Sequence, residues 1–119
     1  MKRWLNSAWY AWKGTVLFFR TEPNGQIELV IAILTLALCI WLPMEVWELC
    51  VVFLCIGALL AAEMLNTAIE RLSNFITRDR HADIGAVKDL AAAAVMMISI
   101  FSALIALFIF VPKIMDVIA

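Results

Sequence analysis

Glycine is scarce in this sequence, with four residues, at positions 14, 25, 57 and 85, in a chain of 119. Glycines this far apart cannot form the glycine-rich loop with which many nucleotide-binding proteins surround a phosphate, and the Walker lysine segment is also missing. The set of motifs typical of protein kinases is absent too. Any nucleotide chemistry in this protein therefore requires a different architecture.

Charge is also scarce. Charged residues make up 16% of the chain and hydrophobic residues 66%, well above the roughly 45–50% apolar content of a soluble domain. The mean hydropathy is +0.99. A chain this short is one domain at most, and its interior is too small to hide so much apolar surface from water. We therefore expect residues 1–119 to form a single integral-membrane domain. The net charge of −1 gives no reason to expect a nucleic-acid partner.

The three cysteines predict neither a disulfide framework nor a metal site. Cys39, Cys50 and Cys55 all lie in apolar stretches. Their number is odd and their spacing is not that of a metal site, so we interpret them as small apolar side chains. No cleavable signal peptide is visible at the N-terminus, and we expect the membrane segments to stay in the mature protein.

Three apolar stretches are candidates for helices that cross about 30 Å of hydrocarbon. Their uncharged parts are Leu29–Met44, Leu49–Ala62 and Leu90–Val111. With their flanking residues, they predict spans at about 27–44, 47–72 and 89–112. The third apolar stretch is stopped by Pro112 and Lys113.

The segment from about 2 to 20 has a different pattern. Apolar residues recur at intervals of three and four and so share one helical face: Trp4, Leu5, Ala8, Trp9, Trp12, Val16 and Phe19. The other face carries Arg3, Asn6, Ser7, Tyr10 and Lys13. This pattern is typical of an amphipathic helix in the plane of the membrane interface. A helix of a soluble core is the alternative, but no such core is expected here.

The basic residues indicate an orientation. Eight of the nine flank one side of the predicted membrane: Lys2, Arg3, Lys13, Arg20, Arg71, Arg78, Arg80 and Lys88. Only Lys113 lies on the other side. Because cytoplasmic loops carry an excess of lysine and arginine, we expect the N-terminus and the Ser73–Lys88 loop to be cytoplasmic and the C-terminus to be outside.

A polar stripe begins inside the second apolar stretch. Glu63, Asn66, Glu70 and Asn74 are spaced by three, four and four residues, which stacks them along one helical face. An ionisable residue inside the membrane is costly without a partner, so Glu63 is a candidate functional residue. Hydrogen bonding across a helix interface is the alternative. Two carboxylates on one face favour function.

More polar residues are expected at the same membrane edge: Glu22, Glu28, Asp79, Arg80, His81, Lys88 and Asp89. Clusters rich in carboxylate oxygen suit Mg²⁺, which is usually shared with substrate phosphates. Lys88 offers a positive charge for a phosphate near a helix N-terminus. These residues also have interpretations without a catalytic role. Lys88 can be a lysine that extends its ammonium to the membrane surface, and Asp89 an acid at the start of a helix. His81 can be an ordinary surface residue.

Several blocks of sequence match a known family. The run AEMLNTAIE from Ala62 to Glu70 is followed by His81 and by AVKDLAAAAV from Ala86 to Val95. The segment YAWKG, which starts at Tyr10, and the acid Glu22 precede them. In these blocks, their order and their spacing, nearly the whole chain resembles the bacterial diacylglycerol kinase family.

The resemblance implies a homotrimer that transfers the γ-phosphate of MgATP to a lipid hydroxyl, at active sites between subunits. By similarity, Glu63 is the catalytic base, Glu22 and Glu70 are the Mg²⁺-linked carboxylates, and Asn66 lies beside the reacting groups. The remaining positions that match nucleotide contacts are Arg3, Tyr10, Asp79, Arg80, His81, Lys88 and Asp89.

Two departures from the family bear on nucleotide affinity and lipid choice. Asn74 stands where the family usually has aspartate, and Gly25-Gln26 replaces a bulkier and more basic pair. The favoured acceptor is diacylglycerol, giving phosphatidic acid, because the spacing between Glu70 and Lys88 is more like that branch. Undecaprenol, the substrate of related kinases, is the alternative.

The sequence thus predicts an all-α membrane protein of three transmembrane helices and an N-terminal surface helix, assembled as a homotrimer in a bacterial inner membrane. A small proton-coupled multidrug transporter is an alternative of another class, but such proteins usually have four spans and a glutamate in the first. A structural subunit without activity is a third possibility, and it leaves the clustered carboxylates unexplained.

Overall fold

The structure, a computed structural model, describes residues 1–119 as four helices. They are α1 (Lys2–Thr21), α2 (Pro23–Trp41), α3 (Val46–Ile76) and α4 (Ala82–Ile118). The last three are long and apolar enough to cross a membrane. This confirms the prediction of an all-helical chain with three candidate spans.

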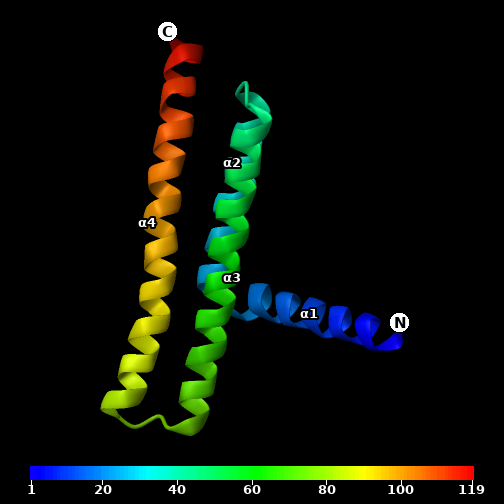
Figure 1. The fold of residues 1–119 in the computed structure, drawn as a ribbon. Helices are drawn as coiled ribbons and strands as arrows, with labels where there is room; N and C mark the ends of the chain where they lie inside the picture. The colour runs from blue at the N-terminus through cyan, green and yellow to red at the C-terminus, as the bar shows by residue number, and fades with distance from the viewer.

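The helices are arranged around α3 (Figure 1). α3 and α4 form a long antiparallel hairpin, and α2 packs on α3 without its backbone approaching that of α4. α1 projects crosswise from this bundle and does not contact α4. We call the end that carries residues 77–81 the loop end, and the opposite end, with residues 42–45 and the C-terminus, the turn end.

The fourth helix is longer than the membrane span predicted from the sequence. It begins at Ala82 and continues through Pro112 to Ile118, whereas the predicted span covers about 89–112. Proline removes one backbone donor from a helix, but packing compensates for it here. Ile114 packs against the buried cluster at the turn end, and the Lys113 ammonium donates to the Pro43 carbonyl at 2.8 Å.

The buried core is small. A cluster of five residues joins α2, α3 and α4 near the turn end: Cys39, Leu42, Val52, Ile109 and Phe110. In total, 12 of 119 residues are buried, while large apolar side chains are exposed along all four helices. Burial on this scale cannot stabilise the chain in water. The exposed apolar surface and the three candidate spans are those of a membrane protein.

Gly25 and Gln26 both make close contacts at the connection between α1 and α2. Gly25 is buried beneath the ring of Phe18, and a Cβ atom at this position would lie 2.5 Å from Phe18 Cε1. The Gln26 amide donates to the carbonyls of Phe19 and Arg20, at 3.1 and 3.4 Å. These carbonyls lie in the last turn of α1, where helix acceptors lack backbone partners. Gly25 and Gln26 thus fix the end of α1 on α2.

Candidate active site

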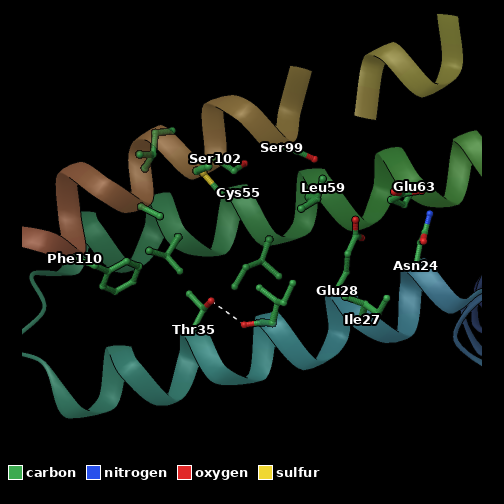
Figure 2. Close-up of a pocket in the computed structure, with 16 residues that line it drawn as sticks. Asn24, Ile27, Glu28, Thr35, Cys55, Leu59, Glu63, Ser99, Ser102 and Phe110 are labelled. Carbon is green, nitrogen blue, oxygen red and sulfur yellow. Dashed lines mark hydrogen bonds between the residues drawn. The ribbon is translucent and has the colours of Figure 1, made fainter. Parts of the chain in front are cut away.

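An apolar cavity of about 490 Å³ lies between α2, α3 and α4. Its walls are mostly apolar, with the hydroxyl groups of Thr35, Ser99 and Ser102 along its length, and its carboxyl and amide groups lie toward the loop end (Figure 2). There, Asn24 and Glu28 point from α2 toward Glu63 on α3 (Figure 2). The cavity is therefore an apolar compartment with carboxylates at one end.

Glu63 is buried, with 8% of its surface exposed. Glu28 on α2 faces it across the helix interface (Figure 2), and one carboxylate oxygen of Glu28, Oε2, is buried without a hydrogen-bond partner. Two facing carboxyl groups in an apolar cavity are costly unless a ligand or a proton offsets their charge.

The predicted polar stripe follows α3 from the cavity to the loop end. Glu63 is buried, Asn66 and Asn74 are half-buried, and Glu70 is exposed. All four lie within α3 (Val46–Ile76), and their spacing places them on one side of the helix. The stripe leads from the apolar cavity to the polar surface of the loop end.

Glu22 lies at the extended residue between α1 and α2, with φ −106° and ψ 113°. Its Oε1 atom accepts a hydrogen bond of 2.5 Å from Nη2 of Arg71 on α3. Arg71 follows Glu70 directly in sequence. Glu22, one of the two carboxylates that the resemblance assigns to Mg²⁺, is therefore bound by the residue that follows the other one, Glu70.

A second, more polar cavity of about 430 Å³ lies at the loop end. Four of the residues predicted to contact a nucleotide line it: Asp79, Arg80, His81 and Lys88. The Lys88 ammonium also donates to the Asn74 amide oxygen at 2.5 Å, which ties α4 to α3 beside the cavity. Asp89 follows on α4 and is exposed. The structure thus brings the loop residues and Lys88 together.

Arg3 and Tyr10 are not brought to this cavity within one chain. Both are exposed on α1, which points away from α4 and has no contact with it. The Tyr10 ring lies 5.7 Å from the Lys13 ammonium of the same helix. A site that uses α1 together with Lys88 and Asp89 requires α1 of another copy or a large movement of this one.

The residues present fit Mg²⁺ as a nucleotide-bound ion. Within one chain, no three His, Cys, Asp or Glu side chains gather into a metal-binding group, so the fold offers no all-protein cage. Mg²⁺ in nucleotide sites is usually held by one or two carboxylates together with phosphates and waters. Glu22, whose carboxylate already accepts a cationic guanidinium, and the exposed Glu70 match that donor set.

Sequence reasoning missed two features of this site. Glu28 was expected at the membrane edge, but its position opposite Glu63 was not predicted. Arg71 was counted only as a basic residue, yet it binds Glu22 across 49 positions of sequence. No spacing rule finds such a contact, because it depends on how α1 and α2 pack against α3.

Comparisons with known proteins agree with the sequence blocks described above. Residues 9–110 match the family described as prokaryotic diacylglycerol kinase. Undecaprenol kinase of Bacillus subtilis (strain 168) is 35% identical over 113 residues, which cover 95% of this chain and 92% of that protein. Diacylglycerol kinase of Escherichia coli (strain K12) is 28% identical over 95 residues, or 80% of this chain and 78% of that protein.

Proposed function

The chain belongs to the prokaryotic diacylglycerol kinase family, and from this premise we propose that it transfers the γ-phosphate of ATP to the hydroxyl of a membrane lipid. The family predicted from the sequence is thereby confirmed, and with it a membrane-bound kinase of lipid metabolism. The observation that carries the proposal is the buried Glu63 at the polar end of an apolar cavity. An acyl or prenyl chain fits such walls, and its hydroxyl fits the carboxylates.

Two lipids are candidates for the acceptor. The undecaprenol kinase matches at 35% identity and the diacylglycerol kinases at 28%, which favours a polyprenol. The spacing between Glu70 and Lys88 favours diacylglycerol, the acceptor expected from the sequence, with phosphatidic acid as its product. Both acceptors present one hydroxyl on a long apolar body, so both suit the cavity. The first experiment must therefore compare them directly.

In the proposed mechanism, Glu63 accepts the proton of the lipid hydroxyl as a general base. The alkoxide oxygen then forms a bond to the γ-phosphorus of ATP, the bond to the β-phosphate oxygen breaks, and ADP leaves. Phosphoryl transfer requires mainly positioning and charge stabilisation from the protein. Asn66, one turn beyond Glu63 on α3, is placed to orient the reacting groups.

In this proposal, residues at the loop end stabilise the negative charge of the ATP phosphates. When bound, Mg²⁺ neutralises negative charge on the phosphates, and Glu22 and Glu70 are the residues that would hold it. Lys88, Arg80 and His81 border the polar cavity and would bind phosphate oxygens, since ammonium and guanidinium groups form strong charge-assisted hydrogen bonds. Asp79 and Asp89 are proposed to contact the rest of the nucleotide.

A homotrimer is part of the proposal. Arg3 and Tyr10 on α1 cannot meet Lys88 and Asp89 within one chain, because α1 does not contact α4. A neighbouring copy that supplies the missing segment would complete the site. Mixing chains that carry Arg3→Gln and Tyr10→Phe on α1 with chains that carry Asp89→Asn on α4 tests this directly. Recovered activity is expected if each site draws on two copies, and none if every chain holds its own complete site.

The proposed orientation follows the basic residues. The N-terminus and the loop end would face the cytoplasm of a bacterium, where ATP is available, and the C-terminus would face outside. α1 would lie in the interface with its tryptophan face toward the lipid. Labelling of single introduced cysteines at both ends of α4 in intact cells would test the assignment.

The decisive experiment uses purified protein in mixed micelles with MgATP and either undecaprenol or diacylglycerol. We expect phosphorylated lipid from the wild type and a loss of turnover by about 100-fold or more for Glu63→Gln, as for removal of a general base. Thermal unfolding of the variant should match the wild type. Failure of the wild type to phosphorylate either lipid would remove the proposed function, and near-native turnover by Glu63→Gln would remove the base assignment.

A further inference from the structure

One side chain connects the α1–α2 junction to α3. Nη2 of Arg71 donates two hydrogen bonds, one of 2.5 Å to Glu22 Oε1 and one of 2.6 Å to Thr21 Oγ1. The Thr21 hydroxyl in turn bonds the Leu17 carbonyl at 2.8 Å. Both hydrogens of this guanidinium nitrogen are therefore used on two consecutive residues.

The contact is too exposed to be explained by stability. The side chains of Arg71 and Glu22 are 45% and 26% exposed, and exposed ion pairs contribute little to folding. What the contact does fix is geometry. Glu22 has an extended backbone at the break between two helices, and from those two helices its carboxylate receives only a long hydrogen bond of 3.4 Å from the Thr21 hydroxyl. Arg71 orients that carboxylate from α3.

The position of Arg71 links this geometry to the proposed chemistry. It follows Glu70 directly, so its Cα lies about 100° around the same turn of α3. The residue next to one proposed metal carboxylate thus holds the other. It engages Oε1 of Glu22, and the second oxygen of that carboxylate makes no hydrogen bond within the chain, which leaves it free for a divalent cation.

We propose that Arg71 is a positioning residue that binds the Glu22 carboxylate and fixes it against the turn of α3 that carries Glu70, so that both carboxylates can serve one divalent cation. This inference rests on the proposed function, because it takes Glu22 and Glu70 as the residues that hold Mg²⁺. Arg71 itself touches neither substrate nor metal. It acts through Glu22, and it belongs to none of the sequence blocks that identify the family.

The inference predicts a loss of metal affinity without a loss of fold. In Arg71→Gln, binding of Mn²⁺, used as a paramagnetic probe with a non-hydrolysable ATP analogue, should weaken by about tenfold, as for residues that orient a metal ligand. In turnover assays, the Mg²⁺ concentration for half-maximal rate should rise by a similar factor, with a smaller change in the maximal rate. Arg71→Lys, which keeps the charge but loses the planar fork, should recover part of the affinity.

Matched variants separate positioning from charge and from stability. Arg20→Gln removes an exposed arginine one residue before Thr21 and should leave Mn²⁺ binding unchanged. Glu22→Gln should weaken Mn²⁺ binding at least as much as Arg71→Gln does, and the double variant should lose no more than Glu22→Gln alone, because Arg71 acts only through Glu22. Thermal unfolding of Arg71→Gln should match that of Arg20→Gln.

Three results would overturn the inference. Mn²⁺ binding in Arg71→Gln that is unchanged, or tighter because a competing cation has been removed, would exclude positioning. Thermal unfolding well below that of Arg20→Gln would make the contact structural. A wild type that binds no Mn²⁺ would remove the metal role altogether. The lipid assay reports separately on the proposed function. If the wild type phosphorylates lipid but Arg71→Gln binds Mn²⁺ as tightly as the wild type, the proposed function stands and only this inference is excluded.

Discussion

The Lys88 ammonium on α4 donates a 2.5 Å hydrogen bond to the amide oxygen of Asn74 on α3, at the border of the polar cavity of the loop end. The acceptor is neutral, so it orients the lysine without cancelling its charge. The two other N–H groups of the ammonium remain available for phosphate oxygens. Asparagine at position 74 therefore leaves more positive charge at this site than an aspartate would.

Asn74→Asp should weaken ATP binding. A carboxylate at this position would pair with Lys88 and oppose the phosphates, and a partly exposed ion pair of up to about 1 kcal/mol corresponds to a KM for ATP raised by roughly fivefold. Steady-state kinetics with saturating lipid measures this change. Asn74→Ala is the control, because it removes the hydrogen bond without adding charge and should change the KM less. Equal effects of the two variants would show that orientation, not charge, matters at Asn74.

The parts of this protein that were predicted from sequence are those set by local spacing. Apolar runs of membrane length indicated α2, α3 and α4, and the spacing from Glu63 to Asn74 placed four polar residues on one side of α3. Contacts between elements were not predictable in this way. The opposition of Glu28 and Glu63 depends on the register between α2 and α3, and the continuation of α4 past Pro112 depends on packing at the turn end. Homotrimeric assembly stays a prediction.

Glu28→Gln should stabilise the protein. The substitution keeps the shape of the side chain and removes one of two facing acidic groups in the apolar cavity, where the Glu28 Oε2 atom has no partner. We expect the midpoint of thermal unfolding in detergent to rise by about 3 °C or more. Asp116→Asn, at an exposed acid near the end of α4, should leave the midpoint unchanged. Turnover should fall far less than in Glu63→Gln, and an equal loss would place Glu28 in the chemistry.

Lys113→Met should destabilise the turn end. The Lys113 ammonium lies 2.9 Å from Glu48 Oε2 and donates to the Pro43 carbonyl, and Glu48 also accepts from the backbone of Glu45 at 2.7 Å. Removing the cation leaves a buried carboxylate with its charge unbalanced. We expect the midpoint of thermal unfolding to fall by about 5 °C, with lipid turnover at low temperature preserved because the candidate active site lies toward the loop end.

The double variant Lys113→Met/Glu48→Gln tests the cause of this loss. It removes both charges together, so it should recover part of the stability that Lys113→Met alone loses. Lys113→Arg, which keeps a cation, should stay close to the wild type. A double variant that is less stable than Lys113→Met would indicate that Glu48 stabilises the turn mainly by capping α3 through its bond to Glu45.

Gly25→Ala should disturb the packing of α1 against α2. A Cβ at Gly25 would lie 2.5 Å from Cε1 and 2.6 Å from Cζ of Phe18, whose side chain is buried. The ring must move, and overpacking of this kind typically costs about 1–3 kcal/mol. Because Glu22 lies between Phe18 and Gly25 in the same junction, lipid turnover should fall together with the midpoint of thermal unfolding.

Gly14→Ala is the matched control for this substitution. It adds the same methyl group to the same region of the chain, but no atom lies within 4 Å of the new Cβ, and alanine favours a helix over glycine by about 1 kcal/mol. Gly14→Ala should therefore unfold at the same temperature as the wild type or slightly higher. Adding Phe18→Leu to Gly25→Ala should restore part of the lost turnover, because a smaller side chain makes room for the methyl group. If Gly25→Ala behaves like Gly14→Ala in both assays, close packing of Phe18 on Gly25 does not position α1.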